Sequence, residues 1–131
     1  MSGYTLKNLK QVDDSAVSFG LSPAMETRFA RDDLESEQLG LSYQRLAPGA
    51  RQPFSHRHGH DEELYIVLSG TGWVQLEGEA VALLPLDALR VSPATVRSFA
   101  AGPQGMELLA VGPSGSGDAE ALPVEWQDTL G

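Results

Sequence analysis

Residues 56–70 read HRHGHDEELYIVLSG, in which three histidines and a block of carboxylates lie directly before an apolar run that ends at Gly70. His56 and His58 are two residues apart, and side chains two apart on an extended strand point to the same face. Neutral imidazole is the commonest nitrogen ligand for a metal, and the carboxylate of Glu63 adds a charged oxygen. The sequence therefore predicts a metal site at the entrance to a buried strand.

Turn residues punctuate the chain regularly on both sides of these histidines. Markers at positions 40, 49, 59, 70, 78, 86, 93, 102 and 112 recur at steps of 7 to 11 residues. Gly70 to Gly72 and Gly102-Pro103 are among the turns that this pattern predicts. Short strands at such a spacing are typical of an all-β sandwich or barrel. We expect the strands at residues 25–29, 41–46, 64–68, 73–76, 80–84, 88–91, 96–100 and 106–111.

Composition narrows the possible classes of protein. The chain has 131 residues, of which 41% are hydrophobic, and this is enough for one domain with its own core. There is no cysteine, so a metal must be held by nitrogen and oxygen ligands. The charge is 9 − 18 = −9, which disfavours nucleic acid and anionic membrane surfaces as partners. No signal peptide or spanning segment is evident, so a soluble cytoplasmic protein is expected.

Three regions follow from the distribution of apolar residues and turns. Residues 1–24 carry few bulky apolar groups, and we expect an N-terminal arm with at most a short strand. Residues 25–112 contain the predicted strands of a single antiparallel barrel. Residues 113–131 form a C-terminal tail in which Leu122 and Trp126 are apolar enough to dock on the barrel or on a partner subunit.

The spacing of the histidine stretch resembles the first conserved motif of the cupin superfamily. In this chain the motif spans residues 49–70: His56-x-His58, four residues, Glu63, six residues, then Gly70. Gly49 takes the place of the opening glycine, although six residues separate it from His56 where five are usual. The resemblance implies a small antiparallel β-barrel of the jelly-roll type, with the metal site inside its mouth.

The second cupin motif resembles residues 85–97 and departs from the family pattern at two positions. Leu86 replaces a turn glycine, which is tolerable if the turn avoids positive φ. Arg97 replaces the third histidine, normally the last metal ligand, and a protonated guanidinium has no lone pair for a metal. The site is therefore incomplete by the family's own pattern.

Three interpretations of this gap remain open. A metal is held by His56, His58 and Glu63 alone or together with His60. Alternatively, Arg97 pairs with Glu63 inside the barrel and an ion pair replaces the metal. In the third interpretation, the planar guanidinium of Arg97 binds the carboxylate or phosphate of a ligand.

The resemblance implies a metal-dependent enzyme that acts on a small molecule, of the oxygenase, isomerase or decarboxylase type. The cofactor would be a divalent ion, with zinc, iron, nickel and manganese all compatible with histidine and carboxylate ligands. Arg97 would orient an anionic group, and Tyr43 or Tyr65 would donate a proton. The alternative is a metal-free binding protein in which Arg97 and Glu63 recognise a small polar or anionic ligand. Cupins commonly form homodimers, so a homodimer is expected here.

Overall fold

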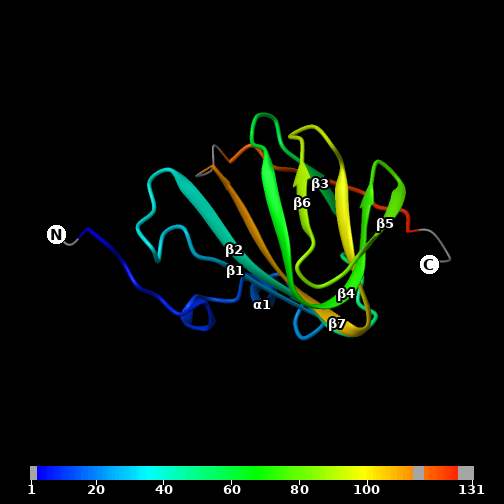
Figure 1. The fold of residues 1–131 in the computed structure, drawn as a ribbon, viewed down its shortest axis with the longest axis horizontal. Helices are drawn as coiled ribbons and strands as arrows, with labels where there is room; N and C mark the ends of the chain where they lie inside the picture. Colours follow the sequence, from blue (N-terminus) through cyan, green and yellow to red (C-terminus); the bar gives the residue numbers. More distant parts are fainter. Residues whose placement is uncertain (1–2, 114–116, 127–131) are drawn as a thin grey trace.

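The computed structural model describes residues 3–113 and 117–126, and these form one curled antiparallel β-sheet (Figure 1). The expectation of an all-β antiparallel barrel is confirmed. The strands in the described residues are β1 (Met25–Phe29), β2 (Leu39–Leu46), β3 (Ser55–Arg57), β4 (Glu63–Leu76), β5 (Glu79–Leu83), β6 (Ala88–Val91), β7 (Arg97–Pro113) and β8 (Glu120–Leu122).

The pairing of β4 with β7 organises the barrel. It runs in antiparallel register from Leu64 opposite Val111 to Leu76 opposite Arg97. On the other side of β7, β2 pairs with residues 106–113, and β1 continues the sheet beyond β2. β5 and β6 pair with opposite halves of β4. β3 pairs with β7, and β8 pairs with β3. The sheet closes around a core that includes Val67, Val74, Phe99, Met106 and Leu108.

Two of the predicted turns are wrong, because β4 and β7 each continue through them as one long strand. The sheet absorbs Gly70 to Gly72 as register shifts within β4, opposite the Gly102–Gly105 region of β7. Gly70 has φ +74°, and a Cβ there would lie 2.0 Å from the carbonyl oxygen of Gly105. Glycine therefore lets the two strands bend past each other without ending them.

The N-terminal arm forms two helical turns, which were not predicted, and its described residues, 3–24, contain no named strand. The helical turns are η1 (Leu9–Gln11) and α1 (Ser15–Ser18). The carboxylate of Asp14 accepts hydrogen bonds from the N–H groups of Ala16 (3.0 Å) and Thr27 (2.9 Å), so it caps α1 and ties it to β1. In the described residues, no helix has the length and apolar character needed to cross a membrane.

Leu86 also departs from expectation, because it adopts φ +68° in the turn between β5 and β6. The turn is held by the carboxylate of Asp87, which accepts the N–H of Leu84 at 2.8 Å. The N–H of Leu86 in turn donates to the carbonyl of Val67 at 2.8 Å. The chain thus adopts a left-handed backbone conformation at Leu86 without the glycine that would lower its conformational energy.

The described part of the C-terminal tail packs on the barrel of its own chain. β8 pairs with β3, with Ala121 opposite His56. The indole N–H of Trp126 donates to the carbonyl of Gln52 at 3.0 Å. Residues 114–116 and 127–131 of the predicted tail lie outside the described residues.

Candidate metal centre

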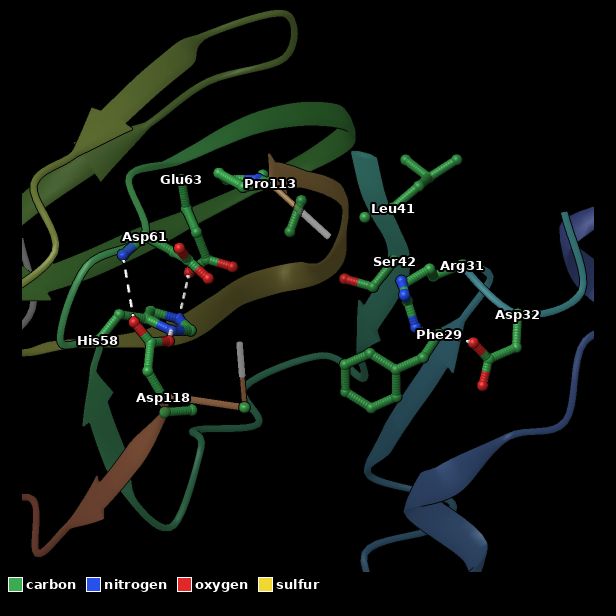
Figure 2. Close-up of a pocket in the computed structure, with 15 residues that line it drawn as sticks. Phe29, Arg31, Asp32, Leu41, Ser42, His58, Asp61, Glu63, Pro113 and Asp118 are labelled. Atoms are coloured by element: carbon green, nitrogen blue, oxygen red, sulfur yellow. Dashed lines mark hydrogen bonds and ion pairs between the residues drawn. The ribbon is translucent and has the colours of Figure 1, made fainter. Parts of the chain in front are cut away.

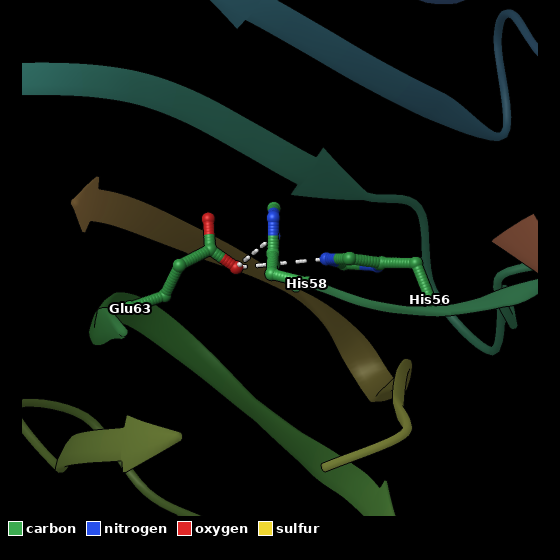
Figure 3. Close-up of side chains that lie close together, drawn as sticks. All are labelled: His56, His58 and Glu63. Carbon is green, nitrogen blue, oxygen red and sulfur yellow. Dashed lines mark hydrogen bonds and ion pairs between the residues drawn. The ribbon is translucent and has the colours of Figure 1, made fainter. Parts of the chain in front are cut away.

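Three side chains with ligand atoms converge where β3 leads into β4. His56 lies within β3, His58 follows that strand directly, and Glu63 is the first residue of β4. Figure 3 shows both imidazoles directed at the same carboxylate oxygen of Glu63. The Nε2 atoms of His56 and His58 lie 3.5 and 3.0 Å from Oε1 of Glu63. The histidine pair and the first carboxylate of the apolar strand thus meet as their spacing predicts.

This donor set fits a divalent transition metal. The ligand atoms of the three residues all lie within 4.8 Å of one another. An ion with bonds of about 2.1 Å to two ligands holds those ligands roughly 3.0–3.5 Å apart for angles between square and tetrahedral. The separations of 3.0 and 3.5 Å from the imidazole nitrogens to Oε1 fall in this range.

Arg97 lies at the back of the site, because the register places it opposite both Leu76 of β4 and His56 of β3. Its side chain is fully buried, and its Nη2 donates to Oε1 of Glu63 at 2.8 Å. Its Nη1 donates to the carbonyls of Pro93 (3.1 Å) and Thr95 (2.8 Å). The ion pair of the second interpretation is therefore present, and protein groups already engage the guanidinium.

The electrostatics of the site keep Glu63 ionised. Burial raises its pKa, but hydrogen bonds from His56, Tyr65 and Arg97 and the charge of His58 outweigh burial and bring the pKa to about 2. The hydroxyl of Tyr65 donates to Oε1 of Glu63 at 2.5 Å. Burial and the negative charge of Glu63 raise the pKa of Tyr65. Tyr65 is therefore a protonated hydrogen-bond donor at neutral pH.

Asp118 holds the other side of His58, although it is not among the site residues predicted from the sequence. Its Oδ1 lies 2.8 Å from Nδ1 of His58, and its Oδ2 accepts the N–H of Asp61 (3.2 Å) (Figure 2). Its Oδ2 also accepts the N–H of His60 (2.6 Å). The backbone N–H of His60, followed by the side chain of His58, lowers the pKa of Asp118. A carboxylate on Nδ1 fixes the ring so that Nε2 points at Glu63, as in carboxylate–histidine–metal triads.

The structure does not bring the other two candidates to this centre. The side chain of His60 is exposed. It belongs neither to the group of His56, His58 and Glu63 nor to a second group of potential ligands among the described residues, formed by His58, Asp61 and Asp118. Tyr43 projects from β2 away from the site: its hydroxyl donates to Glu107 of β7, and the Lys10 ammonium lies 4.9 Å from its ring centroid. Of the two predicted tyrosines, Tyr65 alone contacts Glu63.

Two cavities meet at the candidate ligands, and His58 and Glu63 line both. An inner cavity of about 330 Å³ extends from them into the barrel toward α1 and β1. An outer cavity of about 320 Å³ lies on the side of Asp61 and Asp118 (Figure 2). Arg97 is not among the lining residues of either cavity, so it reaches a ligand there only through Glu63.

Sequence comparison agrees with this architecture. The model of the cupin domain matches residues 42–112, which is more than half of the chain. The chain belongs to the cupin family. The matched range begins within β2 and ends within β7, and it includes His56, His58, Glu63 and Arg97. No curated protein matches this cupin.

Solved structures with a similar fold include other cupins and several enzymes. A cupin protein from Bacteroides fragilis superposes with a TM-score of 0.71 at 26% identity, covering 88% of both chains. The polyketide cyclase RemF from Streptomyces resistomycificus gives a TM-score of 0.72 at 18% identity, covering 95% of this chain and 87% of its own. Salicylate 1,2-dioxygenase from Pseudoaminobacter salicylatoxidans gives 0.62 at 17% identity, covering 75% of this chain and 28% of its own.

Proposed function

We propose that this cupin is a metal-dependent enzyme that acts on a small molecule, with His56, His58 and Glu63 as its metal ligands. The convergence of two imidazole nitrogens on one carboxylate oxygen, at the edge of a cavity of about 330 Å³, carries the proposal. Zinc, iron, nickel and manganese all suit this donor set. Three protein ligands leave coordination positions for a substrate or for water.

The chain's own residues hold this site in place. A bound divalent ion would polarise a substrate oxygen or lower the pKa of a water molecule. Arg97 and Tyr65 both donate to Oε1 of Glu63 and so fix the carboxylate, while Asp118 fixes the ring of His58. We therefore assign Arg97, Tyr65 and Asp118 as positioning residues, because each acts through a ligand.

The class of reaction is proposed more broadly. Structural relatives of low sequence identity include a polyketide cyclase and a salicylate dioxygenase, and likeness of fold does not transfer a reaction. Oxygenation, isomerisation and decarboxylation are the classes that we propose to screen once the metal is known. We also propose a homodimer, supported by exposed apolar side chains at Val81 and Leu84. Light scattering would then give twice the 14.0 kDa chain mass.

One observation favours a second candidate function. The ion pair of 2.8 Å between Arg97 and Glu63 neutralises the carboxylate without any metal. In that case the barrel is a metal-free binding protein, and the polar groups around Glu63 recognise a small polar ligand. The two candidates differ in a quantity that is simple to measure, the metal content.

Zinc titration by calorimetry, with elemental analysis of the purified untagged protein, tests the first candidate. We expect near-stoichiometric zinc in the wild type and none in a His56→Ala/His58→Ala double variant that melts as a folded protein. Equal metal in both proteins contradicts the ligand assignment. A wild type without metal, together with an Arg97→His variant that binds zinc, favours the metal-free binding protein.

A further inference from the structure

The inner cavity is apolar along most of its wall. Leu21, Met25, Phe29, Phe54 and Tyr65 line it, and the candidate metal ligands form part of the same wall. Its volume of about 330 Å³ is at the lower limit of small-molecule sites, which span roughly 300–1,000 Å³. A molecule about the size of two fused rings therefore fits, with one end at the ligands.

No lysine or arginine is among the described residues that line this cavity. Its polar side chains away from the metal ligands are uncharged, and some already have protein partners. The amide of Gln44 donates to Oγ of Ser42 at 3.1 Å, and Oε1 of Gln52 accepts the N–H of Phe99 at 2.9 Å. A charged group on the body of a ligand would lose its hydration here without gaining a counter-ion.

The outer cavity is no better suited to an anion. Arg31 is the only lysine or arginine among its described lining residues, and it pairs with Asp32 at 3.1 Å. Asp61 and Asp118 add two further carboxylates to the same wall. A phosphate or a second carboxylate would meet negative charge on this side of the candidate ligands.

We propose that the substrate is a molecule with an oxygen-bearing end, such as a phenol or an enol, and an uncharged, apolar body. The oxygen end binds the metal held by His56, His58 and Glu63, and the body fills the inner cavity. This inference rests on the proposed function for the metal end. The proposal excludes sugar phosphates and dicarboxylates as substrates, because their charged groups would lie against the apolar wall without a counter-ion.

A matched pair of probes tests the inference on the zinc-loaded full chain. A dihydroxynaphthalene with vicinal hydroxyls presents two oxygens to zinc and a neutral body, and its ring-sulfonated analogue differs by one distal charge. Calorimetry should show the neutral probe binding at least about tenfold more tightly, because the sulfonate has no partner in the cavity. Equal or tighter binding of the sulfonated probe, with zinc bound, overturns the inference and leaves the metal assignment intact.

Variants at Gln44 make the test independent of the probes' own chemistry. Gln44→Arg places a cation in the cavity wall, and we expect it to reduce the preference for the neutral probe by about tenfold. Gln44→Glu should increase that preference, so either variant suffices if the other does not fold. Gln11→Arg makes the same change of charge on the exposed arm and should leave the preference unchanged. A response as large in Gln11→Arg as in Gln44→Arg contradicts the assignment of the cavity.

Failure of the metal proposal is distinguishable from failure of this one. If zinc does not bind the wild type, the same probe pair is measured on the metal-free protein. A preference for the neutral probe that responds to Gln44→Arg then supports the cavity as the site of an uncharged body. The absence of any preference overturns the inference.

Discussion

Two carboxylates in this barrel, Glu26 and Glu63, are both mostly buried and both pair with arginine, yet their other partners differ. Glu26 lies in β1, where its Oε2 accepts from Lys10 (2.7 Å) and Arg28 (2.6 Å) and its Oε1 accepts from Arg45 (2.8 Å). These three permanent cations come from the arm, β1 and β2. Glu26 therefore joins these three segments and has no histidine partner among the described residues.

Glu63 has one permanent cation, Arg97, and its other partners are Tyr65, His56 and His58. Its hydrogen bonds and ion pairs with described residues all fall on Oε1. Hydrogen bonds and charge bring the pKa of Glu26 and of Glu63 to about 2 against the effect of burial, so this value does not distinguish the two sites. The imidazole partners of Glu63 distinguish the two sites, because among all of these partners only imidazoles offer lone pairs to a metal.

The largest effect is expected from Glu63→Gln. It leaves the fully buried guanidinium of Arg97 without its counter-ion, which should cost about 3 kcal/mol of unfolding free energy in urea denaturation. It also removes the charged metal ligand, so zinc affinity should fall by about 100-fold or more. Glu62→Gln removes the neighbouring exposed carboxylate, 3.4 Å from Arg90, and should change neither quantity measurably. Unchanged zinc affinity in Glu63→Gln would place the metal elsewhere.

Glu26→Gln should destabilise the protein without touching the metal site. We expect the unfolding free energy to fall by about 2 kcal/mol, less than for Glu63→Gln. Lys10 and Arg45 are partly exposed, so water can solvate their charges once the carboxylate is gone. Zinc affinity measured by calorimetry should equal that of the wild type. A reduced zinc affinity would mean that the arm and the metal centre are coupled, and the contrast between the two carboxylates would fail.

The pH dependence of stability sharpens the assignment of Glu26. Its pKa in the folded protein is about 2, below the ordinary value of 4.5, so its stabilising contribution is complete above pH 4.5 and disappears as the pH falls toward 2. The difference in unfolding free energy between wild type and Glu26→Gln should therefore be constant from pH 6 to pH 7 and shrink below about pH 4.5. A difference that persists at pH 2 would show that packing, not charge, explains the effect.

Asp118→Asn tests how Glu63's histidine partner is oriented. The amide oxygen can still accept the N–H groups of His60 and Asp61. The negative charge that faces Nδ1 of His58 is lost. Zinc affinity should fall by about 10-fold, at the low end for removal of an outer partner of a metal ligand. Glu120→Gln, which removes a nearby exposed carboxylate paired with Arg57 at 3.0 Å, is the matched control and should have no effect. Equal affinities in all three proteins would exclude a positioning role for Asp118.

The contrast between the two carboxylates also explains what the sequence alone could predict. His56, His58 and Glu63 lie within eight consecutive residues, so strand periodicity and spacing were enough to bring them together. The partners of Glu26 come from residues 10, 28 and 45, and Asp118 meets His58 across 60 residues. Such pairings depend on strand register and on the path of the tail, which no local pattern encodes.

The errors in strand boundaries have a similar origin. Glycine at Gly70 and at Gly102 indicates a turn when only the local sequence is considered. In the barrel a Cβ at Gly70 would lie 2.0 Å from a backbone oxygen of β7, and one at Gly102 would lie 3.1 Å from the backbone oxygen of Thr71 in β4. The long pairing of the two strands outweighs the local turn preference. The burial of Arg97 likewise depended on the register between β7 and β4, which the sequence left open.

The smallest effect is expected from Leu86→Gly, which changes stability far from both carboxylates. Leu86 is 78% exposed and holds φ +68°, so glycine should relieve about 1 kcal/mol of backbone strain. The greater freedom of glycine in the unfolded chain offsets part of this, leaving a gain of about 0.5 kcal/mol.

Gly78→Ala is the reciprocal control: Gly78 has φ +84° and open space where the alanine methyl group would lie, and the variant should lose about 1 kcal/mol. Zinc affinity should be unchanged in both variants, because neither alters a ligand or its partners. If zinc affinity instead followed unfolding free energy across this pair, the losses of zinc affinity expected in Glu63→Gln and Asp118→Asn would report the stability of the barrel. Distinguishing a structural from a metal-binding carboxylate would then require direct metal spectroscopy.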